Sequence, residues 1–104
     1  MRLPIKHLKI GDHRFSVRFG DCGECFGMLC FDAREILLDR KLCATPRNCF
    51  DTLTHEAMHA ALHVAGVSFG ETYDEETIVR AMDHLFLPAL GRIMAAYGGR
   101  FPAF

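Results

Sequence analysis

The chain has 104 residues, half of them hydrophobic, and a formal net charge of −1. A chain of this length and composition predicts one globular domain, residues 1–104, that buries about two thirds of its unfolded surface. The near-neutral charge argues against nucleic-acid binding within this chain, and neither a membrane-spanning run nor a signal-peptide core is present, so we expect a cytoplasmic protein without a membrane partner.

The first forty residues predict a small sheet, because apolar and polar side chains alternate along the first two of its runs. Two such runs flank Gly11-Asp12, a pair typical of a tight hairpin turn. A third and a fourth run follow a Gly/Cys-rich turn and are joined by a short reversal at 32–34. The predicted strands are 5–10, 13–19, 26–31 and 35–39.

Five cysteines include one Cys-x-x-Cys pair, Cys22 and Cys25. An odd number of cysteines without a secretion signal fits reduced thiols better than a disulfide framework. One interpretation makes the pair half of a second, structural zinc site that Cys30, Cys43 or Cys49 would have to complete, but no second Cys-x-x-Cys is present. We therefore expect turn or core cysteines and leave them out of the functional site.

A helix of about twenty residues is predicted after the strands. Thr45 is a suitable N-cap, Pro46 suits the first helical position, and Gly66 can end the helix. Its apolar positions recur at three- and four-residue steps, which is typical of a buried helix. These positions are Phe50, Leu53, Ala57, Ala60, Ala61, Val64 and Ala65.

The middle of this helix carries the most informative motif, His55-Glu56-Ala57-Met58-His59. Residues four apart lie on one helix face, so His55 and His59 can share one metal ion. Glu56, one step round the helix, can reach a water held by that ion. Two imidazoles and a carboxylate at this spacing predict a Zn²⁺ site in which Glu56 acts as general base.

A second helix is predicted from Asp74, with Thr72 or Asp74 as its cap and acidic residues in its first turn. Pro88 either kinks or ends it, and residues 90–97 form further helix that Gly98-Gly99 closes. Strands followed by helices predict an α+β fold, a small antiparallel sheet packed on a helical layer that contains the motif helix and a second, ligand-bearing helix.

A third zinc ligand has to come from outside the motif helix. Leu62 and Ala65 stand where a metzincin needs glycine and histidine, and His63 lies about 12 Å along the helix from His55, too far to share its ion. A short connection allows the two helices to pack antiparallel, so the second helix can supply the ligand. Its candidates are Glu75, Glu76, Asp83 and His84, and helical spacing slightly favours Glu75, which shares a stripe with Val79, Met82 and Phe86.

This layout resembles the minigluzincin type of compact zinc peptidase from phages and bacteria, and it is similar to the small metallopeptidases that cleave phage repressors. The matching segments are Phe26-Gly27, residues 36–39, residues 52–60, and residues 76–81 leading to Leu87-Pro88. In such proteins the ligand glutamate stands three residues before a small aliphatic residue. The resemblance therefore implies a zincin-like fold and Glu76, three residues before Val79, as the third ligand, with Arg80 as a departure from the usual supporting residue.

Together, these observations predict a zinc metallopeptidase in which His55, His59 and Glu76 bind the metal and Glu56 is catalytic. The predicted partner is a protein or peptide substrate that lies along an exposed sheet edge near residues 26–31. Tyr73, His63, His84 and Arg80 are the candidates for stabilising the oxyanion.

Two alternatives remain. One is a catalytically silent domain that zinc only braces and that serves in regulation or binding; the presence of Glu56, which such a site does not need, counts against it. The other is a protease-like domain whose third ligand is a histidine, with His84 in that role. The near-neutral charge counts against the nucleic-acid association of such domains.

Overall fold

Four strands are followed by helices in the computed structural model, which describes residues 3–67, 75–100 and 102. The α+β fold class is confirmed. In chain order, the elements are β1 (His7–Ile10), β2 (His13–Gly20), β3 (Gly27–Cys30), β4 (Glu35–Asp39), α1 (Pro46–Val64), α2 (Glu75–Ala81), the π-helix η1 (Met82–Phe86) and α3 (Leu87–Ala96).

The sheet is mixed, so the expectation of an antiparallel sheet was wrong in one pairing. Its order is β1-β2-β4-β3, in which β2 and β4 are parallel and the other two pairs are antiparallel. Burial explains the order: Ile36, Leu38 and Asp39 of β4 are buried, whereas no residue of β3 is. The more buried β4 occupies a central position, and β3 lies at the edge.

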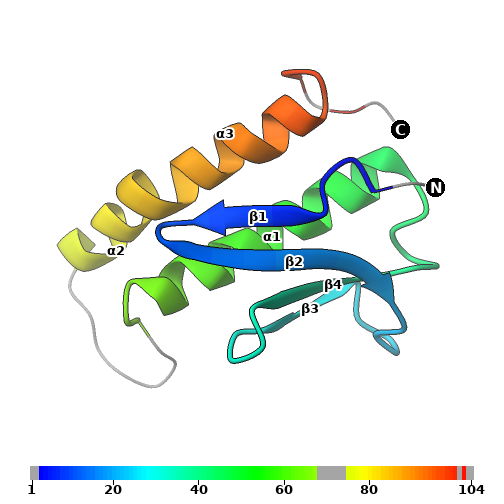
Figure 1. The fold of residues 1–104 in the computed structure, drawn as a ribbon, viewed down its shortest axis with the longest axis horizontal. Coiled ribbons are helices and arrows are strands. Elements are labelled where there is room, and N and C mark those ends of the chain that lie inside the picture. Colours follow the sequence, from blue (N-terminus) through cyan, green and yellow to red (C-terminus); the bar gives the residue numbers. More distant parts are fainter. Residues whose placement is uncertain (1–2, 68–74, 101, 103–104) are drawn as a thin grey trace.

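One hydrophobic core joins the sheet to the helices. Figure 1 shows α1 crossing one face of the sheet and α3 running along the side of β1, with α2 beyond the hairpin that joins β1 and β2. The largest fully buried side chains come from β1, β2, β4, α1 and α3. They include Leu8, Ile10, Phe15, Ile36, Leu38, Leu53 and Ile93.

Helix α1 has the bounds that its capping residues predict. The Thr45 side chain accepts a hydrogen bond from the Asn48 backbone N–H at 3.1 Å, and Pro46 is the first helical residue. Gly66 adopts φ +83°, the left-handed conformation that ends many helices and that glycine adopts without steric cost.

The helix after residue 75 passes Pro88 without ending. Proline has no N–H, and its ring clashes with the carbonyl four residues earlier. The turn before it is widened into η1, where the Leu87 N–H bonds to the Met82 carbonyl, and Pro88 then lies in the first turn of α3. A π-turn therefore accommodates the proline, and α3 ends at Ala96, shortly before the positive φ of Gly98 and Gly99.

Within the part of the chain that the structure describes, no helix is both long and apolar enough to cross a membrane.

Candidate metal centre

The two motif histidines converge on one point of the α1 surface. Their Nε2 atoms lie 3.2 Å apart, and their ring centroids lie 4.8 Å apart with the planes 78° from parallel. Two imidazole nitrogens bound to one tetrahedral Zn²⁺ at about 2.0–2.1 Å would be separated by about 3.3–3.4 Å. The rings of His55 and His59 therefore already stand close to the separation that a shared zinc ion requires.

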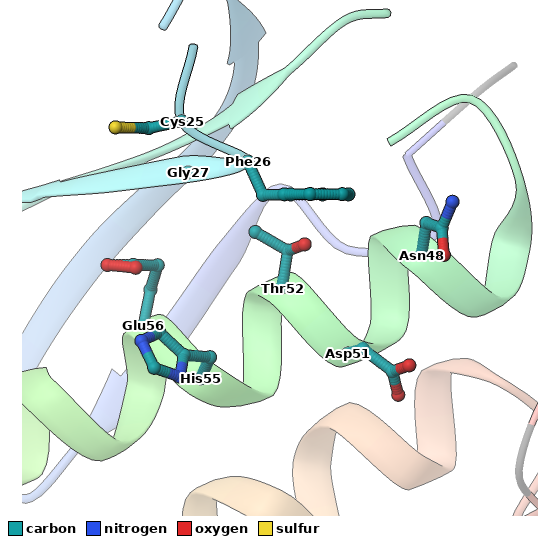
Figure 2. A pocket seen from close by; sticks show the side chains of 8 residues that line it. All are labelled: Cys25, Phe26, Gly27, Asn48, Asp51, Thr52, His55 and Glu56. Atoms are coloured by element: carbon teal, nitrogen blue, oxygen red, sulfur yellow. The ribbon is translucent and has the colours of Figure 1, made fainter. Parts of the chain in front are cut away.

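Glu56 has an unusual environment for a carboxylate. Only 7% of the residue is exposed, and within the described residues no side chain or backbone group pairs with its oxygens. Its oxygens are not among the buried side-chain atoms that lack a partner in the described residues, so the carboxylate end faces the open space that Glu56 lines. Figure 2 shows its side chain rising from α1 towards the strand that carries Gly27.

A cleft of about 560 Å³ opens beside this carboxylate. Figure 2 shows His55 and Glu56 at one end, Asn48 towards the other end, and the ring of Phe26 above Thr52. Phe26 is 50% exposed, although a phenylalanine is usually buried. We call this space the Glu56 cleft; it is lined by Cys25, Phe26, Gly27, Asn48, Asp51, Thr52, His55 and Glu56.

Residues 25–27 cover the Glu56 cleft, and we call this segment the cleft roof. Contacts of the Phe26 carbonyl hold it in place. This oxygen accepts a hydrogen bond from the Asp39 N–H at 2.7 Å and lies 3.4 Å from the Cys43 thiol. The Asp39 carboxylate in turn accepts bonds from the Leu42 and Cys22 N–H groups at 2.9 and 3.0 Å. These two bonds hold the pKa of Asp39 below its usual value, so the carboxylate stays ionised and fixes the loops on both sides of the cleft roof.

The predicted third ligand, Glu76, lies at the start of α2, beyond the motif. A surface pocket lined by Ala65, Thr77 and Arg80 places this end of α2 beside the C-terminal end of α1, as expected for antiparallel helices. The Glu76 carboxylate is 68% exposed and pairs with Arg80 at 3.2 Å. Across residues 3–67, 75–100 and 102, no three His, Cys, Asp or Glu side chains gather where they could hold one metal ion.

The other predicted candidates take different positions. His63 stacks on Phe31, with ring centroids 5.1 Å apart, so its ring belongs to an aromatic cluster. His84 is 73% exposed, and its Nε2 atom lies 4.0 Å from a carboxylate oxygen of Asp83. Tyr73 lies outside the described residues.

The cysteines all carry free thiols. Cys22, Cys43 and Cys49 are buried, and burial raises the pKa of each. Cys25 is exposed and lines the Glu56 cleft.

Sequence reasoning did not identify the packing of Gly27 against Thr52 and Glu56. A signal was present, because Thr52 stands four residues before Glu56 and therefore shares its helix face. The partner strand could not be assigned in the same way, since alternation along a strand does not reveal which helix residue it will meet.

Comparison with known proteins adds no family to this geometry: the chain matches no family model, and no significant similarity to a curated protein or to a solved structure was found.

Proposed function

We propose that this protein is a zinc-dependent peptidase of the minigluzincin type, acting in the cytoplasm on protein or peptide substrates. His55 and His59 bind the metal, Glu76 completes the ligand set, and Glu56 is the general base. The observation that carries the proposal is the 3.2 Å approach of the two Nε2 atoms next to Glu56, whose carboxylate has no partner among the described residues. A site that only bound metal would have no use for that carboxylate.

The ligand chemistry fits zinc. Neutral imidazole nitrogens with one carboxylate form a common three-ligand set for catalytic zinc, which leaves one position open. A bound Zn²⁺ would polarise the scissile carbonyl and acidify the attacking water. The described residues supply the two imidazoles, and the third ligand requires Glu76 to exchange its ion pair with Arg80 for the metal.

The chain's own groups account for the proton transfers and for substrate placement. Glu56 accepts the proton of the attacking water and passes it to the leaving amine. Because β3 is an edge strand that begins directly above Glu56, an extended peptide can pair with its free edge and present its backbone to the carboxylate. The Glu56 cleft is then available for a substrate side chain next to the scissile bond.

Zinc stoichiometry tests this proposal. The purified protein should bind about one Zn²⁺ per chain, and His55→Ala and His59→Ala should each abolish stoichiometric binding. His63→Ala is the matched control, because this histidine lies on the same helix but stacks on Phe31. Full zinc occupancy in either motif variant, or equal loss in the control, would refute the ligand assignment.

A further inference from the structure

The first residue of β3 is a glycine that lies directly against the motif helix. A Cβ atom built at Gly27 would be 2.6 Å from Cγ2 of Thr52 and 3.0 Å from the backbone oxygen of Leu37. Its φ is not among the positive values of the chain, so the backbone conformation does not demand glycine here. The reason for glycine is the close approach of the strand to α1.

The close approach of β3 to α1 also brings the strand against the side chain of Glu56, the proposed general base. The third nearest atom to that Cβ position is Cγ of Glu56, at 3.3 Å. The backbone of β3 therefore covers the stem of Glu56, which limits the rotamers open to its carboxylate. An extra methyl group would lift the strand, press on this stem, or both.

A polar link holds the strand in this position. The sulfur of Cys43 lies 3.4 Å from the Thr52 hydroxyl oxygen and 3.4 Å from the Phe26 carbonyl oxygen. Cys43 is fully buried, so water does not compete for these contacts. Thr52 thus meets β3 twice, through its methyl group at Gly27 and through its hydroxyl group by way of Cys43.

We propose that Gly27 and Thr52 are positioning residues for Glu56: their direct packing sets the height of β3 above α1 and so fixes where the carboxylate stands in the Glu56 cleft. This inference rests on the proposed peptidase function. Neither residue needs to touch substrate or metal for the effect.

The first test is Gly27→Ala. A misplacement of about 1 Å in a catalytic group can cost about 100-fold in rate, so kcat on fluorophore-quenched casein should fall by at least about tenfold. The loss should fall more on kcat than on KM, and zinc occupancy should stay at the wild-type level. Gly91→Ala is the matched control, because nothing lies within 4 Å of its added Cβ; its kcat should equal that of the wild type.

The second test is rescue by Thr52→Ser, which removes the methyl group at the 2.6 Å contact and keeps the hydroxyl group next to Cys43. In the double variant, Gly27→Ala with Thr52→Ser, most of the lost kcat should return. The melting temperatures of the four zinc-free proteins give a readout that does not depend on activity. They should show coupling, with the glycine substitution less harmful when residue 52 is serine.

The results of these tests distinguish a failure of the positioning role from a failure of the proposed peptidase function. Loss of zinc in Gly27→Ala, a rise in KM with kcat unchanged, or additive melting temperatures would each overturn the positioning role while leaving the peptidase proposal intact. A wild-type protein that binds no zinc, or that hydrolyses casein no faster than Glu56→Gln, would overturn the proposed function and this inference with it.

Discussion

The two sides of the candidate centre are built differently. On the side of β3, Glu56 is 7% exposed and is covered by a strand whose first residue has no room for a side chain. On the side of α2, Glu76 and Arg80 form an ion pair whose side chains are 68% and 71% exposed. Close packing defines the first side, and solvent-exposed polar groups define the second.

This difference indicates which part of the site is formed before metal binds. Packing holds Glu56, the proposed general base, in place, whereas an exposed i,i+4 ion pair contributes about 0.3–0.5 kcal/mol and is easily exchanged. The ion pair with Arg80 would therefore oppose zinc ligation by Glu76 only weakly. We therefore expect metal binding to reorganise the α2 side and to leave the β3 side nearly unchanged.

The largest expected effect that distinguishes the two sides comes from removing the proposed third ligand, Glu76. Glu76→Ala should weaken zinc binding by more than about 100-fold, because substitutions outside the ligand shell already cost about 10–100-fold. Glu75→Ala removes only a first-turn carboxylate that interacts with the helix dipole, so zinc affinity should change by less than about threefold. Competition with a chelator of known affinity measures both.

A different ranking in this series would change the assignment. If Glu75→Ala lost more metal than Glu76→Ala, the ligand would move by one residue, or about 100° around the helix. If His84→Ala lost the most, the protein would belong with the peptidases whose third ligand is histidine.

The next largest effect is a loss of folding stability at low pH, and it tests Asp39 on the β3 side. Hydrogen bonds from Leu42 and Cys22 lower the pKa of Asp39 in the folded protein, so its stabilising contribution is present above the unfolded value of about 3.9 and is lost as the pH falls through the folded value. Urea unfolding from pH 7 to pH 3 should show a steeper loss of stability in the wild type than in Asp39→Asn. Equal pH dependence in the two proteins would remove Asp39 as an anchor of the cleft roof.

The smallest effect concerns Arg80. Because its ion pair with Glu76 is exposed, Arg80→Ala should change the stability of the zinc-free protein by less than about 0.5 kcal/mol. Zinc affinity should stay equal or rise by up to about twofold, since Glu76 no longer has to leave a partner. A marked drop in affinity would show instead that Arg80 supports the bound state.

The sequence predicted where helices begin and end better than it predicted which strands lie side by side in the sheet. Thr45, Pro46 and Gly66 bound α1 as expected, because caps act within one turn. The placement of β4 between β2 and β3 depends on which strand buries more apolar surface, a comparison across the whole chain that alternation alone does not make. Pro88 likewise left a choice between a kink and an end, and a π-turn in the preceding residues resolved it.

In the candidate site, the spacing of residues along one helix was enough to predict the motif residues. His55, Glu56 and His59 follow from helix geometry, and the structure brings the two imidazoles together. Glu76 stays a prediction, because its role depends on how two helices meet and on a metal that competes with Arg80. The contact of Gly27 with Thr52 joins a strand to a helix across 25 positions of the chain, a distance at which the sequence pattern carries no contact information.

Glu56→Gln tests most directly whether the Glu56 carboxylate acts beside a zinc ion held by two histidines. The amide keeps the size of the side chain but cannot accept the proton, and general-base assistance contributes about 10²–10⁴ in rate. The zinc-loaded variant should therefore keep one Zn²⁺ per chain and the melting temperature of the wild type, and lose at least about 99% of casein hydrolysis. Hydrolysis at the wild-type rate with zinc bound would contradict the account.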